Sequence, residues 1–275
     1  MRLFDTLNFS KTALVAYPAR TALILLAMTI GVASIIILTS LGDSARHYVT
    51  GQFQSLGTNL LFVLPGRNET TGGLPPLLGT SPRDLTLDDA AALKQSRAIE
   101  HVAPVVIGAA PVSYGVLERE VTVIGSSSEM QTVMDLIMDK GQFLPVSDLD
   151  TGSAVCVLGE KLHKELFEQK NPLGEWIRIG GFRYRVIGVL QAREQVSGFD
   201  FSDAAIIPVS NAQTLFNAPS LFRILIKSSS PQQLEKARGD ILRIVRQRHG
   251  GEDDVTVIRQ DALIGTFNDI LLTLT

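Results

Sequence analysis

Side chains that could bind a metal or transfer a proton are few in this 275-residue chain, and they are scattered. The four histidines, His47, His101, His163 and His249, fall in different predicted elements and lack the spacing of metal ligands. They are therefore predicted to be surface or helix-cap residues. The single cysteine, Cys156, lies in the apolar run AVCVL, which indicates a buried structural thiol. One cysteine excludes an intramolecular disulfide framework and a site with several thiolates.

Three charged segments are further candidates for binding. Residues 148–152 read DLDTG, which is similar to the start of a calcium loop but lacks the third acidic position and the closing glutamate. Residues 252–254 read EDD before a strand. Both segments are predicted to be solvated polar turns. Arg178, Arg183 and Arg185 form a basic patch on a predicted hairpin, open to anionic lipid or a partner, but a solvated strand face is the favoured interpretation.

Sequence signatures of enzymes are missing from the chain. We find no G-x-x-x-x-G-K-[ST], G-x-G-x-x-G, H-E-x-x-H or G-x-S-x-G pattern. We therefore predict no catalytic, cofactor-binding or metal-binding residues and no enzymatic activity. The composition, 45% hydrophobic and 19% charged, is typical of a globular protein. A net charge of −3 without a long basic run disfavours general nucleic-acid binding.

An uncharged segment of 21 residues, 21–41, predicts a transmembrane helix, because it would extend roughly 31 Å, about one hydrocarbon core. Arg2, Lys11 and Arg20 outnumber the one acid, Asp5, on its N-terminal side. The positive-inside rule therefore places residues 1–20 in the cytoplasm, as an amphipathic segment on the membrane surface, and the chain after residue 41 outside. A cleaved signal peptide and a buried helix of a soluble domain are the alternatives. The apolar run is too long for either, and no good cleavage site follows it.

Strand and helix signals alternate along residues 42–275. A strand–helix–strand pattern occurs before residue 125 and again after residue 220, and a β-rich block separates the two. This order predicts an α+β fold in which one domain is split by an inserted one. Expected strands cover 59–64, 99–107, 109–116, 120–125, 175–179, 182–190, 221–227 and 254–259, and expected helices cover 44–55, 87–95 and 230–249.

Local signals mark the ends of several of these elements. Thr86 and Asp89 are spaced as a capping box at the start of the helix over 87–95. Ser230, followed by a proline, predicts the start of the helix over 230–249. Gly180 and Gly181 provide the positive φ angles of a two-residue hairpin turn.

Short segments, taken in order, resemble one known family. None of them is specific alone, but their order and spacing match over nearly all of residues 15–260. They read ARTAL at 19–23, IGVA at 30–33, LGTNLLFV at 56–63, PG at 65–66, LTLDD at 85–89, VIG at 123–125, KGQFL at 140–144, VLG at 157–159, LF at 166–167, NPLGEWIRI at 171–179, FRYRVIGVL at 182–190 and IIP at 206–208. The chain thus resembles the permease subunit of MacB-type ABC transporters, from its first transmembrane helix through its periplasmic core domain.

The resemblance implies a domain plan. A porter-like α+β domain would comprise residues 42–119 and 216–262, with a mostly β subdomain inserted at 120–215. The family has further transmembrane helices after the periplasmic domain, and residues 263–275 are expected to begin the second one. The chain is therefore expected to be a permease truncated before the later helices, as a fragment or as one part of a split permease.

The resemblance also implies a function and partners. Such permeases sit in the bacterial inner membrane, dimerise, and work with an ABC ATPase, here expected in trans. ATP hydrolysis changes the periplasmic domains, which drives export, efflux or lipoprotein extraction, in some relatives with a periplasmic adaptor protein. The alternative function is a membrane-anchored periplasmic interaction module that resembles FtsX and does not transport. A membrane-tethered enzyme is a third class, for which the sequence shows no polar constellation.

Overall fold

The computed structural model describes residues 18–54, 59–66, 83–168, 170–191 and 200–260. These residues belong to two units, a long N-terminal helix and a folded body, which are considered separately. Residues 1–17 of the predicted amphipathic segment over 1–20, and the predicted start of a transmembrane helix over 263–275, lie outside the described residues.

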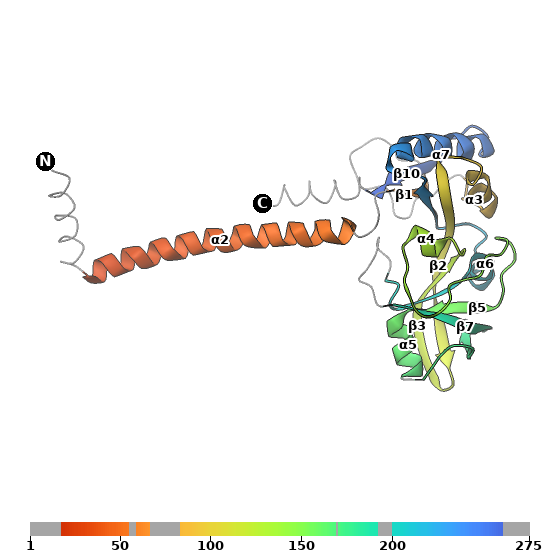
Figure 1. The fold of residues 1–275 in the computed structure, drawn as a ribbon, viewed down its shortest axis with the longest axis horizontal. Helices are drawn as coiled ribbons and strands as arrows, with labels where there is room; N and C mark the ends of the chain where they lie inside the picture. Colours follow the sequence, from red (N-terminus) through yellow and green to blue (C-terminus); the bar gives the residue numbers. More distant parts are fainter. Residues whose placement is uncertain (1–17, 55–58, 67–82, 169, 192–199, 261–275) are drawn as a thin grey trace. The chain divides into compact units, whose positions relative to one another are not determined.

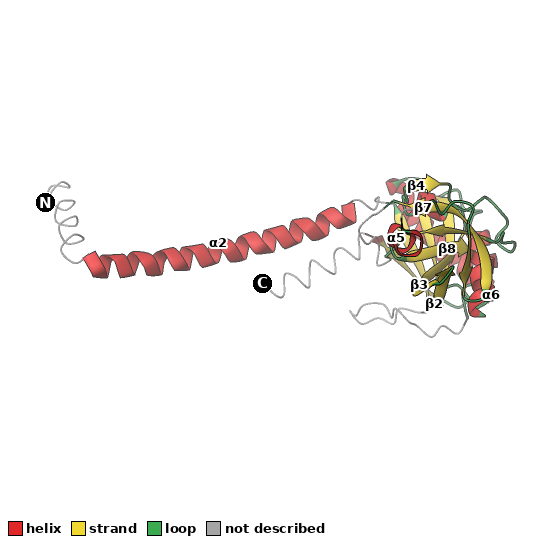
Figure 2. Ribbon diagram, turned by 90° about the horizontal axis from the view of Figure 1, so that it is seen from below, coloured by secondary structure: helices red, strands yellow, loops and turns green. Residues whose placement is uncertain are grey.

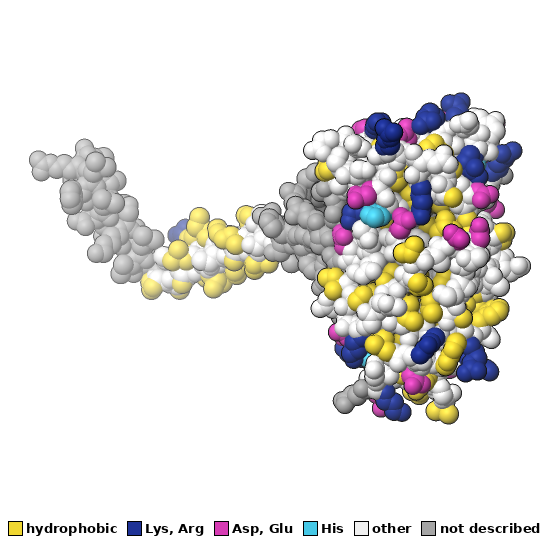
Figure 3. All heavy atoms as spheres, turned by 45° about the vertical axis from the view of Figure 1, so that its right-hand side comes forward, with side chains coloured by type: hydrophobic (Ala, Val, Ile, Leu, Met, Phe, Trp, Pro, Cys, Tyr) yellow, Lys and Arg dark blue, Asp and Glu magenta, His cyan; other side chains and the backbone are white. Residues whose placement is uncertain are grey.

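The N-terminal unit is one helix, α2 (Pro18–Gln54), so the predicted helix over 44–55 is a continuation of the apolar segment. Its part Pro18–Ser40 has a mean hydropathy of 2.6 and is long and apolar enough to cross a membrane. The side chains of this part are exposed and mostly hydrophobic (Figure 3). The hydroxyls of Thr29 and Ser34 donate to the carbonyls of Leu26 and Ile30 at 2.9 and 2.8 Å, so neither is left unsatisfied in an apolar environment.

One half of the body is an antiparallel sheet with two helices on one side. Its strands lie in the order β10-β1-β9-β2, so β9 separates β1 from β2 and β1 separates β9 from β10. The two predicted strand–helix–strand units are therefore confirmed, and they interleave in one sheet. The elements are β1 (Leu60–Pro65), α3 (Leu87–Leu93), β2 (Ile99–Tyr114), β9 (Arg223–Ser228), η1 (Pro231–Gln233), α7 (Leu234–Arg248) and β10 (Val255–Arg259).

The other half is a closed ring of strands. β2 pairs with β3, then β8, β5, β7 and β6 follow, and β6 pairs back onto β2 through Val112↔Ile179 and Ser113↔Arg178. In Figure 2, α5 lies over one end of this ring. The elements are β3 (Leu117–Ser126), α4 (Met130–Val133), β4 (Met138–Gly141), β5 (Val155–Leu158), α5 (Glu160–Phe167), β6 (Trp176–Ile179), β7 (Phe182–Leu190), β8 (Ala204–Pro208) and α6 (Val209–Phe216).

Strand β2 belongs to both halves and runs from one to the other (Figure 1). Its first part, up to Val105, pairs with β9, and its second part, from Val106, pairs with β3. The sequence analysis predicted two strands broken at Gly108, which is wrong. Gly108 lies within one strand, where the missing side chain leaves room for the ring of Phe216. The predicted domain boundaries, 119/120 and 215/216, remain a prediction.

Local signals at three element ends can be compared with the structure. The capping box is confirmed: Asp89 donates its backbone N–H to Thr86 Oγ1, and the Asp89 carboxylate accepts the Thr86 N–H. The β6–β7 turn is confirmed, with φ of 58° at Gly180 and 119° at Gly181. Ser230 is the N-cap residue of the 3-10 turn η1, which leads into α7, and its side chain makes no cap hydrogen bond.

Both faces of the antiparallel sheet β10-β1-β9-β2 are covered by other parts of the body, so its strands carry apolar side chains on both faces. On one side, Leu61 and Val63 of β1 pack in the cluster that includes α3 and α7. On the other side, Leu60 and Phe62 pack in the cluster that includes α4. Cys156 is fully buried in the first cluster, as predicted.

Helix α6 approaches β3 so closely that only glycine fits at one position. A Cβ on Gly125 would lie 2.1 Å from the Cβ of Ala212. We expect Gly125→Ala to lower the free energy of unfolding by about 1–3 kcal/mol, measured by urea denaturation in detergent. Gly239→Ala in α7 is the matched control: a Cβ there meets nothing within 4 Å, so this change should stabilise by about 0.5–1 kcal/mol. Equal effects at both sites would contradict the close packing.

Candidate functional site

The histidines singled out by the sequence do not come together in the described part of the chain. His101 lies near Glu100 and Glu129, with nitrogen–oxygen distances of 3.8 and 3.7 Å. His163 is buried inside α5 beside Phe167, and its Nε2 is 3.3 Å from the Lys170 carbonyl oxygen, so the predicted surface or helix-cap role is wrong for this residue. His249 is the C-cap residue of α7, so the predicted helix-cap role is confirmed for this residue. No group of three metal-binding side chains is present among the described residues, and the side chain of His47 is not among them.

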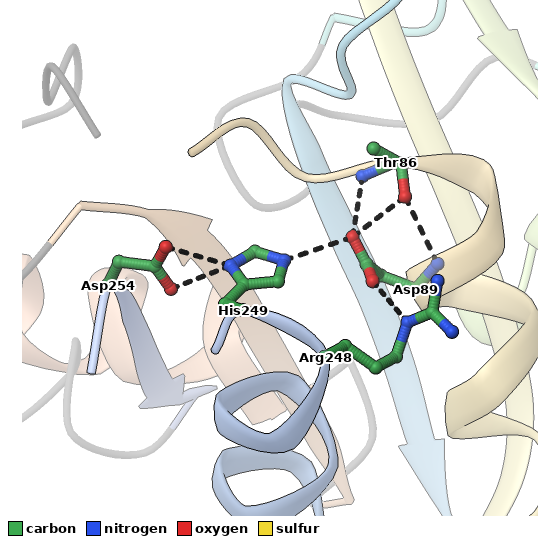
Figure 4. Close-up of polar contacts among 5 residues, drawn as sticks. All are labelled: Thr86, Asp89, Arg248, His249 and Asp254. Carbon is green, nitrogen blue, oxygen red and sulfur yellow. Dashed lines mark hydrogen bonds and ion pairs between the residues drawn. The ribbon is translucent and has the colours of Figure 1, made fainter. Parts of the chain in front are cut away.

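His249 instead takes part in a buried charged cluster, shown in Figure 4. We define the Asp89 cluster as Thr86, Asp89, Arg248, His249 and Asp254. Asp89 comes from the first turn of α3, Arg248 and His249 from the end of α7, and Asp254 from the residue before β10. The cluster thus joins the two interleaved strand–helix–strand units at one end of their sheet.

Each charge in the Asp89 cluster faces an opposite charge. His249 Nδ1 lies 2.8 Å from both carboxylate oxygens of Asp254, and Nε2 lies 3.2 Å from Asp89 Oδ2. Arg248 Nε donates to Asp89 Oδ1 at 2.5 Å. The Thr86 hydroxyl and backbone N–H donate to Asp89 Oδ2 at 2.8 and 3.0 Å. With His249 protonated, two cations balance two carboxylates, and every side chain is hydrogen-bonded.

The surroundings shift the pKa values of two members in opposite directions. Burial alone would raise the pKa of Asp89, but hydrogen bonds from Arg248, Thr86 and His249 outweigh it and lower that pKa. Burial alone would lower the pKa of His249, but hydrogen bonds to Asp254 and Asp89, with the charges of both, raise it. Both shifts favour the charged forms in the folded protein.

This arrangement supports a structural role rather than catalysis. Both ring nitrogens of His249 are directed at carboxylates, so a protonated ring has no lone pair for a metal or for a substrate proton. Asp89, His249 and Asp254 are 2, 4 and 2% exposed, which keeps substrate away from them. The Asp89 cluster therefore acts as an internal tie between α3, α7 and β10.

Sequence reasoning found part of this cluster and missed the rest. The capping box identified Thr86 and Asp89, and His249 had been assigned a surface or cap role. Asp254 was predicted to be a solvated turn residue, which is wrong, because its carboxylate is buried against His249. The only signal was its position next to the apolar strand β10. The predicted solvated turn over 148–152 is confirmed, since its side chains are exposed apart from a partly buried Leu149.

The Asp89 cluster predicts how stability depends on pH. The folded-state pKa of His249 is raised above 6.5, so its contribution is complete below pH 6.5 and is lost as pH rises through the raised value. The pKa of Asp89 is lowered below 3.8, so its contribution is lost only as pH falls through that lower value. We expect the unfolding free energy to decline above pH 6.5, measured by urea denaturation at a series of pH values. His249→Gln should flatten this decline, whereas His101→Gln should leave it in place.

Comparison with known sequences identifies the family. The family described as MacB-like periplasmic core domain matches residues 21–244. A pyoverdine export ATP-binding/permease protein, PvdT, from Pseudomonas entomophila is 32% identical over 251 residues, which are 89% of this chain and 37% of that protein. A macrolide export ATP-binding/permease protein, MacB, from Rhodopseudomonas palustris is 27% identical over 100% of this chain and 41% of its own length. The chain thus spans about two-fifths of these relatives.

Solved structures show the same fold. The periplasmic region of MacB from Actinobacillus actinomycetemcomitans aligns with a TM-score of 0.67 and 22% identity, over 80% of this chain and 98% of that one. The extracellular domain of the ABC-type transporter YknZ from Gram-positive bacteria aligns with a TM-score of 0.59 and 19% identity, over 73% of this chain and 100% of that one. The predicted α+β fold behind an N-terminal apolar helix is therefore confirmed, and the chain belongs to the family of the MacB-like periplasmic core domain, as part of a MacB-type ABC permease.

Proposed function

We propose that this chain is a permease component of a MacB-like ABC exporter and has no enzymatic activity of its own. The observation that carries the proposal is the match over residues 21–244, which joins the apolar helix α2 and the folded body in a single family pattern. Relatives that carry the same region are named for export of pyoverdine and of macrolides, so small secreted molecules are the class of cargo.

In this proposal, α2 anchors the chain in the bacterial inner membrane with its N-terminus in the cytoplasm. The supporting pattern is the basic excess of Arg2, Lys11 and Arg20 before the apolar segment. The body, built as a porter-like domain from residues 42–119 and 216–262 with 120–215 inserted, lies in the periplasm. ATP hydrolysis takes place on a separate ATPase, and conformational change is transmitted through the permease, which works as a dimer with a periplasmic adaptor.

Affinity purification from membranes tests this function. The tagged chain, expressed from its native locus, is extracted in mild detergent, and its partners are identified by mass spectrometry. We expect an ABC ATPase in amounts comparable to the chain, together with an adaptor protein. The double variant Leu26→Ala, Ile30→Ala, which keeps an apolar span, should recover the same partners. Recovery of peptidoglycan hydrolases without an ATPase would overturn transport in favour of an anchored interaction module.

A further inference from the structure

One outward face of the strand ring carries charged side chains that lack ion-pair partners within the described part of the chain. Five such side chains come from β3 on one side of β2 and from β6 and β7 on the other, and all are exposed: Glu118 and Glu120 of β3, Arg178 of β6, and Arg183 and Arg185 of β7. On the opposite side of β3, Arg119 is paired with Glu165 and with Asp203. The unpaired charges are thus gathered on one face rather than spread over the ring.

Strand register arranges these charges in order. Glu118 is directly opposite Ser113, Ser113 opposite Arg178, and Arg178 opposite Arg183, so the four side chains form one row across β3, β2, β6 and β7. Neighbouring strands are about 4.8 Å apart. An acid therefore lies one strand away from Ser113 on one side, and a base lies one strand away on the other side.

An apolar contact point lies at the end of the same face. Trp176 is two residues before Arg178, so its side chain points to the same side of β6, and it is 49% exposed. The guanidinium of Arg183 lies 5.5 Å from the centre of its ring. The β2–β3 turn with the 99% exposed Val116 is close by, because Tyr114 donates to the Glu175 carboxylate at 3.2 Å. Tryptophan and arginine are the side chains most enriched at binding hot spots.

The mixture of charges restricts what can bind this face. An anionic bilayer or a polyanion attracted by the arginines would be repelled by Glu118 and Glu120 on the same face. A matching surface must place a base opposite the acids and an acid opposite the bases. The row through Ser113 meets this condition for Glu118 and Arg178 when the face is rotated by 180° about an axis that runs along β2 above Ser113. Glu118 of each copy then faces Arg178 of the other, and Trp176 faces the β2–β3 turn.

We propose that this Ser113 face, formed by Ser113, Trp176, Glu118, Arg178 and Arg183, is a two-fold contact between two copies of the chain. The contact is isologous, so one self-complementary patch provides both sides of it. This inference rests on the proposed function, because it requires a dimeric permease. It adds the surface through which the two periplasmic bodies contact each other. Since β6 is paired on both of its edges, the contact is made by side chains and not by strand addition.

A cysteine at Ser113 tests the axis directly. Ser113→Cys places two thiols beside the proposed axis, and a short bismaleimide or copper phenanthroline should convert the membrane-embedded chain into a covalent dimer. The native Cys156 is fully buried and should not react. Glu100→Cys, exposed at the other end of β2, is the matched control and should stay monomeric on denaturing gels.

Charge reversal tests the pairing. Glu118→Arg alone and Arg178→Glu alone should each lower the Ser113→Cys cross-linking yield about tenfold, and the double reversal should restore it. Light scattering of the detergent-solubilised chain separates the two possible failures. If the chain is a dimer that does not cross-link at Ser113 and is unaffected by the charge reversals, this contact is wrong, but the proposal of a dimeric permease is unaffected. A monomer at all concentrations overturns both, and loss of cross-linking that the double reversal does not restore overturns the assigned pairing.

Discussion

Asp254→Ala should lower the free energy of unfolding by about 3–5 kcal/mol, because it leaves the buried His249 imidazolium without its main counter-charge. Asp254 and His249 are 2 and 4% exposed, so water cannot replace the lost carboxylate without opening the end of the sheet. The measurement is urea denaturation of the detergent-solubilised chain, followed by circular dichroism. The loss is a large share of the stability of an ordinary domain.

The matched control for this variant is an exposed ion pair that also joins the end of α7 to the segment before β10. Arg246 pairs with Asp253 at 3.4 Å, and both side chains are more than half exposed. Arg246→Ala should therefore change the unfolding free energy by no more than about 1 kcal/mol. If Asp254→Ala had as small an effect as Arg246→Ala, the Asp89 cluster would not tie the two strand–helix–strand units together.

Two arginines in the middle of α2 should abolish membrane integration. Leu26→Arg with Ile30→Arg places two charges in Pro18–Ser40, and each raises the free energy of insertion by about 2.5–3.5 kcal/mol. The fraction of the chain that stays in the membrane pellet after an alkaline carbonate wash should fall from nearly all to a small part. Leu26→Ala with Ile30→Ala, which adds no charge, should remain in the pellet.

An N-terminal tag on the same proteins distinguishes an anchor from a signal sequence. If α2 is an anchor, the tag and the folded body stay on one polypeptide. A mature protein that has lost the tag and leaves the membrane in the wash would contradict the anchor, whatever the arginine variant does.

Features set by neighbouring residues could be predicted from the sequence. The capping box of Thr86 and Asp89, the glycine turn at 180–181 and the apolar length of α2 each depend on residues a few positions apart. The same holds for the two strand–helix–strand units, whose periodicity is local. The first turn after Ser230 is the 3-10 helix η1 and not part of α7. Gly108, which suggested a break, instead makes room for the distant ring of Phe216.

Features that depend on long-range pairing could not be predicted. The closure of the ring needs Ile179 beside Val112, and the insertion of β9 between β1 and β2 needs strands from opposite ends of the body. The Asp89 cluster combines side chains from α3, α7 and the approach to β10. The residue pattern of a single sequence does not show which distant segments come into contact. Asp254 could therefore not be distinguished from its exposed neighbours Glu252 and Asp253.

The position of β1 has a consequence for how the protein is made. β1 is the first strand of the body, yet both of its neighbours, β9 and β10, come after the entire ring in the sequence. During translation, the apolar segment LLFVLP of β1 stays unpaired until β9 and β10 have been synthesised. Contacts between segments so far apart in the sequence form slowly. An exposed apolar strand is a template for association between unfinished chains. The strand order therefore predicts that β1 joins its sheet only after residues 223–259 have been synthesised.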